Sequence, residues 1–194
     1  MTLKSALQFS HHLLTESVEE GDFVVDATVG NGHDTVFLSK LVGTNGTVLG
    51  IDIQTQAIEN TKKRLKEEKI TNVQLLQDSH GNLESYIPNE KHGNIGGAVF
   101  NLGYLPGSDK SIITKPDSTI GAIQSLLPHL LPKKQIVLVV YYGHEGGDKE
   151  KDELLTLVSS LDQNQFSVLQ YGFINQKNNP PFVVAIEKRK ARSS

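Results

Sequence analysis

The chain has 194 residues, of which 37% are hydrophobic and 21% are charged, and its formal net charge is −3. This length and composition predict one soluble globular domain over residues 1–194 and exclude a disordered chain. The negative charge argues against a broad surface that coats nucleic acid, and no apolar run is long enough to span a bilayer. The N-terminal residues lack the pattern of a signal peptide, so we expect a cytoplasmic protein.

The chain contains no cysteine. This excludes disulfides, thiolate zinc sites, iron–sulfur clusters and cysteine nucleophiles. Reactions that begin with cysteine attack on a pyrimidine ring, or that use a radical from a cysteine-bound cluster, are excluded for the same reason. The adjacent His11 and His12 point in different directions if they lie on a helix, so no metal site is expected there.

Apolar runs rich in β-branched residues alternate with amphipathic segments along the chain, which predicts βα units and a parallel sheet. In chain order we expect a helix at 3–15, a strand at 23–28, a helix at 34–41, a strand at 47–53, a helix at 54–68 and a strand at 73–77. These are followed by a strand at 97–101, a helix at 116–131, a strand at 135–142, a helix at 148–161, and strands at 166–174 and 182–187.

The last two predicted strands are joined by a turn that contains Asn178-Asn179-Pro180-Pro181, which leaves no room for a helix. They should therefore form an antiparallel hairpin. The expected fold is α/β and Rossmann-like, with a seven-stranded, mostly parallel sheet, an antiparallel last strand and helices on both faces. The sheet of a dinucleotide dehydrogenase usually continues with parallel strands, so the hairpin argues against that class.

A glycine-rich turn follows the first predicted strand, in the sequence Asp26-Ala27-Thr28-Val29-Gly30-Asn31-Gly32-His33-Asp34. Glycine adopts backbone angles that are closed to other residues and lets a ligand approach the main chain. In a dehydrogenase, a third glycine or an alanine would occupy the place of Thr35, which argues against a pyrophosphate here. The alternative is a tight turn that binds nothing.

Asp52 lies in Gly50-Ile51-Asp52-Ile53 at the end of the second predicted strand, 20 residues after Gly32. A carboxylate at this spacing can accept hydrogen bonds from both ribose hydroxyls of an adenosine, with Gln54 beside it. The alternative is an aspartate that caps the following helix.

The third predicted strand runs into the loop Gln77-Asp78-Ser79-His80-Gly81. In this architecture that loop lies beside an adenine, where Asp78 can accept a hydrogen bond from the exocyclic amine. The competing interpretation is a solvated turn.

The fourth predicted strand leads into Asn101-Leu102-Gly103-Tyr104-Leu105-Pro106-Gly107. This segment is similar to the Asn-Pro-Pro-Tyr loop of amine methyltransferases, in which the asparagine and a backbone carbonyl hold the attacking nitrogen and the ring covers the target. Leu102 and Gly103 replace both prolines, so the loop departs from that pattern. After the fifth strand, His144 lies in a glycine-rich loop at the same edge of the sheet, where it can orient a substrate or accept its proton. The alternatives are a half-buried aromatic at Tyr104 and a surface histidine at His144.

Taken together, the glycine turn, Gly50-Ile51-Asp52-Ile53, Asp78-Ser79-His80 and the segment from Asn101 to Gly107 resemble those of the small bacterial proteins called putative rRNA methylases. These are class I S-adenosylmethionine-dependent methyltransferases, and the resemblance covers nearly the whole chain. It implies S-adenosylmethionine as the cofactor, held by Asp26, Gly30, Asn31, Gly32, His33, Asp34, Asp52, Gln54, Asp78, Ser79 and His80. We expect Asn101 and Tyr104, together with His144 of the loop after the fifth strand, to be the catalytic residues.

Members of this family are associated with transfer RNA. The resemblance therefore implies methylation of the aminomethyl nitrogen of 5-aminomethyl-2-thiouridine at the wobble position, with the tRNA anticodon stem-loop as partner. An unprotonated primary amine is already a nucleophile, so no covalent enzyme intermediate is needed, which agrees with the absence of cysteine. Neither DNA nor a membrane is expected as a partner, and the oligomeric state is left open, with a homodimer among the options.

Two other functions compete with this one. The first is a methyltransferase that acts on ribosomal RNA or on a small-molecule amine, and the second is a nucleotide-binding module without catalysis. Three basic clusters are interpreted as solvated surface, with a modest RNA footprint as the alternative. They comprise Lys62, Lys63, Arg64, Lys66 and Lys69; Lys133 and Lys134; and Lys188, Arg189, Lys190 and Arg192.

Overall fold

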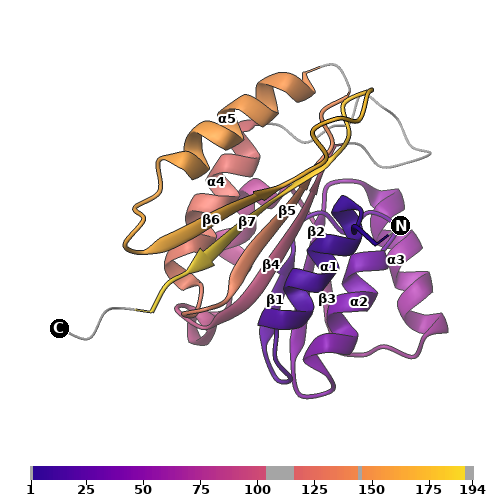
Figure 1. Ribbon diagram of the computed structural model, residues 1–194. Coiled ribbons are helices and arrows are strands. Elements are labelled where there is room, and N and C mark those ends of the chain that lie inside the picture. Colours follow the sequence, from indigo (N-terminus) through magenta and orange to yellow (C-terminus); the bar gives the residue numbers. More distant parts are fainter. Residues whose placement is uncertain (1, 104–115, 144–145, 191–194) are drawn as a thin grey trace.

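The computed structural model describes residues 2–103, 116–143 and 146–190. Its centre is a seven-stranded sheet with the strand order β3-β2-β1-β4-β5-β7-β6 (Figure 1). The strands are β1 (Phe23–Asp26), β2 (Thr47–Asp52), β3 (Val73–Gln77), β4 (Ile95–Leu102), β5 (Gln135–Val140), β6 (Phe166–Tyr171) and β7 (Phe182–Lys188). Neighbouring strands from β1 to β5 are parallel, whereas β7 is antiparallel to both β5 and β6. This confirms the predicted Rossmann-like sheet and its closing hairpin.

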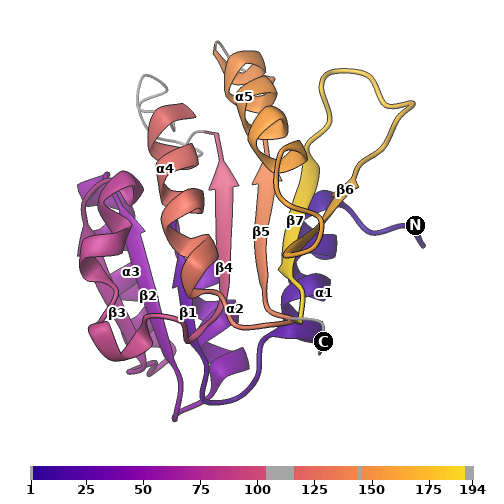
Figure 2. The ribbon, with the colours of Figure 1, turned by 90° about the vertical axis from the view of Figure 1, so that its left-hand side faces the viewer.

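Helices cover both faces of the sheet (Figures 1 and 2). Helices α1 (Ala6–Ser17), α2 (His33–Val42) and α3 (Thr55–Glu67) lie on one face, and α4 (Pro116–Leu126) and α5 (Gly147–Ser159) lie on the other. The short segments η1 (His80–Tyr86), η2 (Asn89–Lys91) and η3 (Leu127–His129) are 3-10 helices. Among the described residues, no helix has the length and apolar character needed to cross a membrane.

Two hydrophobic clusters fill the space between the sheet and its helices. On β4, Val99 belongs to the same cluster as Leu38 of α2, whereas its neighbour Phe100 belongs to the cluster of Ile123 in α4 and Leu154 in α5. The alternation follows from the period of two along a strand, which turns successive side chains to opposite faces. Burial on both faces explains why the central strands are almost continuously apolar.

The structure adjusts several predicted boundaries for local reasons. Helix α1 begins at Ala6 because Ser5 is its N-cap, and the side chains of Ser5 and Gln8 each accept the other's backbone N–H, at 3.3 and 3.0 Å. The helix predicted over 116–131 ends as an α-helix at Leu126 and continues as η3, which contains Pro128. The segment predicted as a loop after β3 contains η1 and η2, which the sequence pattern did not reveal.

The strand order reverses between β1 and β4, because β1 leads to β2 on one side while β4 leads to β5 on the other. At such a switch point the loops that leave the two carboxyl ends diverge, and α/β proteins bind ligands in the crevice between them. The carboxyl ends of β4 and β5 are at the top of Figure 2. Residues at this edge are the candidates for function.

Candidate active site

Asp26 is the last residue of β1 and is fully buried. Its Oδ2 accepts a hydrogen bond from the Thr35 hydroxyl at 2.6 Å, and its Oδ1 accepts one from the Thr28 backbone N–H at 3.2 Å. Burial, followed by the nearby carboxylate of Asp34, raises the pKa of Asp26 to about 7, and Asp52 acts in the same direction. Asp26 is therefore an acid whose ionisation responds to any positive charge placed nearby.

Asp52 is the last residue of β2, and its carboxylate is hydrogen bonded to the glycine turn and to the residues before α3. Its Oδ2 accepts the Gly30 backbone N–H and its Oδ1 accepts the Gln54 backbone N–H, both at 2.9 Å. A carboxylate offers about four lone-pair positions, so two further hydrogen bonds can be accepted beside these two. The bonds to the two loops explain the spacing of this aspartate from the glycine turn. The ribose contact is compatible with this geometry and stays a prediction.

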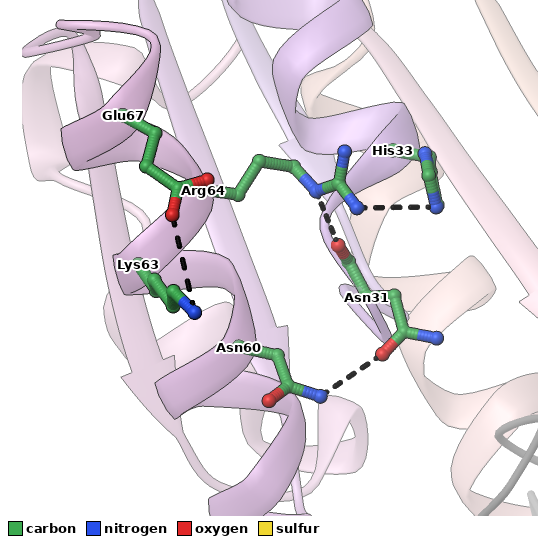
Figure 3. A pocket seen from close by; sticks show the side chains of 6 residues that line it. All are labelled: Asn31, His33, Asn60, Lys63, Arg64 and Glu67. Atoms are coloured by element: carbon green, nitrogen blue, oxygen red, sulfur yellow. Dashed lines mark hydrogen bonds and ion pairs between the residues drawn. The ribbon is translucent and has the colours of Figure 1, made fainter.

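The side chains of Asn31 and His33 turn toward α3 (Figure 3). Asn31 Oδ1 accepts from Asn60 Nδ2 at 3.1 Å, and the Asn31 backbone carbonyl accepts from Arg64 Nε at 2.9 Å. His33 Nε2 lies 3.4 Å from Arg64 Nη2. Both side chains therefore make contacts with α3. The backbone of the turn is the part that remains for contact with a ligand. Their role in cofactor binding stays a prediction.

The loop after β3 is held by its own hydrogen bonds. Asp78 accepts from the hydroxyl of Tyr86 and the backbone N–H of Ser79, each at 2.7 Å, and from Asn82 Nδ2 at 3.0 and 3.1 Å. These bonds, that of Tyr86 first, hold the pKa of Asp78 below its ordinary value. Ser79 caps η1 by accepting the Gly81 N–H at 3.2 Å. The carboxylate of Asp78 thus stabilises the conformation of the loop. Its predicted contact with an adenine stays a prediction.

His80 is a buried residue that joins the end of β1 to α4. Its ring hydrogen bonds with the Ala27 backbone, and its Nε2 lies 3.2 Å from Ser118 Oγ and 3.4 Å from Thr119 Oγ1. The ring also packs edge-on against Phe100. Burial lowers the pKa of His80, so the imidazole is neutral at physiological pH. The contacts of this residue serve the packing of the loop, and its predicted cofactor contact is a separate role that stays a prediction.

Asn101 lies near the end of β4, and both its backbone and its side chain are hydrogen bonded. Its backbone N–H donates to Thr28 Oγ1 at 2.6 Å, and its Nδ2 donates to the carboxylate of Asp34. Its Oδ1 is buried and accepts no hydrogen bond from the residues that the structure describes. A buried amide oxygen without a donor is unfavourable by about 1–3 kcal/mol. It is thus an acceptor suited to a ligand that brings an N–H or O–H group.

Asp34 connects Asn101 to a residue that sequence reasoning missed. His11 Nε2, on α1, lies 2.6 Å from Asp34 Oδ1, and the side chains of His11 and Asp34 are 30% and 7% exposed. The His11 ring also stacks on Phe37 of α2, with centroids 4.0 Å apart. The sequence offered one weak signal, since His11 lies three residues before the buried Leu14 and so near the core side of its helix. Nothing in the sequence paired it with a residue 23 positions away.

Tyr141 directly follows β5 at the same edge. Its backbone N–H donates to the Leu102 carbonyl at 3.0 Å. Burial, followed by the charge of Asp34, raises the pKa of Tyr141, so the phenol stays protonated at neutral pH. The predicted catalytic residues Tyr104 and His144 lie outside the described residues, and their approach to Asn101 stays a prediction.

The comparisons with known proteins place this arrangement in a family. The model of the family described as Putative rRNA methylase matches residues 48–187. The chain belongs to this family. A model of protein-L-isoaspartate O-methyltransferases also matches residues 5–86, the part that carries the glycine turn and Asp52. The curated relative tRNA (mnm(5)s(2)U34)-methyltransferase, chloroplastic, from Arabidopsis thaliana is 34% identical over 95% of this chain and 70% of its own length.

Two solved structures are similar over almost the whole of both chains. A putative rRNA methylase from Clostridium thermocellum is 44% identical, with a TM-score of 0.92 over 97% of this chain and 100% of that one. A putative methyltransferase from Streptococcus mutans, in complex with SAH, is 41% identical, with a TM-score of 0.88 over 96% of this chain and 99% of that one. The protein is therefore an S-adenosylmethionine-dependent methyltransferase, as predicted.

The residues at the carboxyl edge fit this cofactor. S-adenosylmethionine carries a sulfonium and an amino group, and the edge holds three carboxylates, of Asp26, Asp34 and Asp52. A cationic ligand would relieve their mutual repulsion, which contributes to the raised pKa of Asp26. Asp52 retains acceptor capacity for ribose hydroxyls, and the buried Oδ1 of Asn101 has no donor among the described residues.

Proposed function

We propose that this protein transfers a methyl group from S-adenosylmethionine to the aminomethyl nitrogen of 5-aminomethyl-2-thiouridine at the tRNA wobble position, which gives 5-methylaminomethyl-2-thiouridine. The family and the name of the Arabidopsis relative support an RNA substrate of this kind. The structural observation that carries the proposal is the unpaired, buried Oδ1 of Asn101. A primary amine brings the N–H donor that this acceptor lacks.

The orientation of the Asn101 amide follows from its partner. An ionised carboxylate accepts hydrogen bonds and cannot donate them, so Asp34 selects the Nδ2 side of the amide. Oδ1 is then left on the opposite side, as an acceptor. The hydrogen bond between Asn101 N–H and Thr28 Oγ1 holds the backbone at the same point. The amide is thus pre-oriented before a substrate arrives.

The pre-oriented acceptor has a defined task in amine methylation. An amine that donates one N–H to Asn101 Oδ1 has its lone pair directed away from that bond, toward the electrophile. S-adenosylmethionine, when bound, supplies the methyl group as an electrophile on a sulfonium ion. The carboxylates of Asp26 and Asp34 would favour that positive charge, and we expect Asp52 to hold the ribose. We expect Tyr104 to cover the target base and His144 to accept the proton that the amine releases.

The reaction can be tested directly with purified protein. Bulk tRNA from a strain that lacks the final methylation is incubated with the protein and S-adenosylmethionine, and its nucleosides are quantified by mass spectrometry. We expect 5-aminomethyl-2-thiouridine to disappear as 5-methylaminomethyl-2-thiouridine appears. An unchanged wobble nucleoside would contradict the proposal, and methylation of ribosomal RNA or of a free amine in the same assay would identify the competing function.

The role of Asn101 is tested by Asn101→Ala, for which we expect kcat to fall about 100-fold, because loss of the acceptor leaves the amine misplaced. The matched control is Asn94→Ala, which removes an exposed asparagine amide that contacts only the Glu90 carbonyl, at 3.4 Å, among the described residues. This control should keep full activity. Binding of S-adenosylmethionine, measured by calorimetry, should be similar in both variants. Full activity in Asn101→Ala would show that the amide does not hold the substrate.

A further inference from the structure

The three basic clusters of the sequence differ in how the structure uses them. In the second cluster, Lys134 is buried and its Nζ lies 2.8 Å from both Asp22 Oδ2 and the Ser17 carbonyl. In the third, Lys188 Nζ donates to the Pro128 carbonyl at 3.0 Å, and Arg189 Nη1 donates to the Gln163 carbonyl at 2.8 Å. The charged groups of these residues hold the fold together. The first cluster, on and just after α3, is different.

An open hollow of about 340 Å³ lies between helix α3 and the glycine turn (Figure 3). Its lining combines the turn with one side of the helix and consists of Asn31, His33, Asn60, Lys63, Arg64 and Glu67. All six side chains are polar or charged, and two of them carry a permanent positive charge. A hollow of this character suits an anion or a strongly polar group and does not suit an apolar ligand.

Arg64 is held in a fixed position at this hollow. Its Nε donates to the Asn31 carbonyl at 2.9 Å, and its Nη2 lies 3.4 Å from His33 Nε2. In the described parts of the chain, no carboxylate comes within ion-pair distance of its guanidinium, although Lys63, its neighbour on α3, has an acidic partner. Guanidinium presents five N–H donors in a planar fork, and most of them remain for a ligand. A fixed guanidinium without a carboxylate partner is the arrangement that recognises phosphate oxygens.

Lys63 supplies a second cation at the same hollow. Its side chain is 80% exposed, and its Nζ is 4.0 Å from Glu67 Oε1, one turn further along α3. A pair of this length at an exposed site contributes little to stability, so Lys63 is available to a better partner. Asn31 adds its side-chain amide N–H groups, since its Oδ1 is the atom bonded to Asn60. Arg64, Lys63 and Asn31 thus each offer hydrogen-bond donors at the lining of the same hollow.

We propose that this hollow binds a backbone phosphate of the RNA substrate. The inference rests on the proposed function to the extent that it takes RNA as the substrate. Asn31 lies between Gly30, whose N–H is bonded to Asp52, and Gly32, so a phosphate bound here is adjacent to the turn that we expect to hold the cofactor. A backbone contact of this kind sets the position of the RNA without reading its sequence. It would allow a chain of net charge −3 to hold a polyanion through a local site.

The test uses a fluorescent anticodon stem-loop RNA, the full-length protein and anisotropy titrations at several salt concentrations. Lys63→Glu should weaken RNA binding about tenfold and lower the magnitude of the salt slope by about one, as expected for a lost phosphate contact. Glu67→Gln should tighten RNA binding several-fold, because it removes the carboxylate opposite the phosphate. The matched control is Lys62→Glu, a charge reversal at an exposed neighbour on α3 that does not line the hollow.

The outcomes separate a site from a general charge effect. Equal weakening by Lys62→Glu and Lys63→Glu would overturn the proposal, because it would show a diffuse attraction to the helix. Loss of S-adenosylmethionine affinity in Lys63→Glu without loss of RNA affinity would also overturn it and assign the hollow to the cofactor. Binding of inorganic phosphate that depends on Lys63, with RNA binding unchanged, would identify a site for free phosphate instead.

The anisotropy assay reads binding and not turnover, so its failure differs from failure of the proposed function. If the wobble nucleoside is not methylated but RNA binding depends on Lys63, the phosphate site stands and the assigned base is wrong. If the nucleoside is methylated and Lys63→Glu binds RNA like the unmodified protein, the phosphate site alone is wrong.

Discussion

At the scale of single residues, Asp26 is a buried acid whose ionisation a nearby cation would favour. Burial of its carboxyl group, followed by the charge of Asp34 and with a smaller contribution from Asp52, raises its pKa to about 7 in spite of hydrogen bonds from Thr35 and Thr28. Titratable groups with such shifts concentrate at functional sites. Without a ligand, the ionised form of Asp26 is therefore unfavourable in the folded chain. A bound cation would favour that form.

Asp26→Asn should stabilise the cofactor-free protein at pH 8 by about 1–3 kcal/mol, because it removes a buried charge that the fold disfavours. The pKa of Asp26 is raised from 3.8 in the unfolded chain to about 7 in the folded chain, so the folded state retains a proton between these values. The contribution of Asp26 to the stability of the folded protein therefore falls as pH rises from about 4 to about 7. The difference in stability in favour of Asp26→Asn over the unmodified protein should grow over the same interval. Thermal unfolding from pH 4 to pH 8 measures it.

The control for this series is Asp117→Asn at an exposed position in the first turn of α4. Its difference from the unmodified protein should not grow from pH 4 to pH 8. An Asp26→Asn variant that is less stable at pH 8 than the unmodified protein would contradict the raised pKa. The same variant should bind S-adenosylmethionine more weakly, since the carboxylate that favours its positive charge is absent.

His11 is the second residue with a testable role, as a positioning residue that acts through Asp34. His11→Ala should lower kcat about tenfold and leave the affinity for S-adenosylmethionine within twofold, because Asp34 loses the partner that orients it toward Asn101. His11→Gln keeps a side-chain N–H that can reach Asp34 and should recover most of the activity. Steady-state kinetics with tRNA would measure both variants.

The neighbouring His12→Ala is the matched control, because His12 is exposed and its described ring contact is with Phe9. It should leave kcat unchanged. If His11→Gln is as impaired as His11→Ala while both fold normally, the contact with Asp34 is not what activity requires.

At the scale of elements, the glycine turn joins β1 and α2 to α3. Gly32 has φ +77, and a Cβ at this position would lie 2.6 Å from Thr61 Oγ1 on α3. Thr61 itself donates to the Gly30 carbonyl at 3.2 Å, so the helix packs closely on the turn. Both the backbone angle and the close approach require glycine at position 32.

Gly32→Ala should therefore destabilise the protein by about 2–4 kcal/mol, since it combines backbone strain with a steric contact. Gly93→Ala separates the two causes, because Gly93 has the same φ of +77 and a Cβ added to it would meet no atom within 4 Å. It should destabilise by about 1 kcal/mol. Chemical unfolding of both variants measures the two losses of stability. Equal losses would show that the Thr61 side chain moves aside without an energetic cost.

The loop after β3 shows where element prediction was incomplete. The sequence placed β3 at its observed bounds, 73–77, but the following residues were interpreted as a loop with a candidate ligand contact. In the structure, Asp78 and Ser79 lead into a 3-10 helix, and His80 anchors it beneath α4. Short 3-10 helices lack a hydrophobic repeat long enough to be recognised, so their presence depends on tertiary contacts.

At the scale of the whole molecule, the crossover rule accounts for most of the layer arrangement. A connection between parallel strands is right-handed. Helices α2 and α3 connect strands that follow β1 toward one edge of the sheet, whereas α4 connects β4 to β5 toward the other edge. The two sets of helices therefore lie on opposite faces (Figure 1). Helix α1 precedes the first strand, and no such rule governs it. Its place is set by contacts with distant elements, such as the stacking of Phe9 on Tyr171 of β6 and the bond from the Tyr171 hydroxyl to the Lys4 carbonyl, at 2.7 Å.

The sequence by itself determined the order and type of the principal elements, the reversed last strand of the chain, and the glycine turn with Asp52 at its fixed distance. These depend on short-range patterns: the period of the strands, the backbone freedom of glycine and the chemistry of a hairpin turn. Only the tertiary structure decided that His11 meets Asp34, that Asn31 and His33 face α3, and that Lys134 is buried while Lys63 is not. These contacts join residues far apart in the chain, and they exist because packing of the helices on both faces of the sheet brings those residues together.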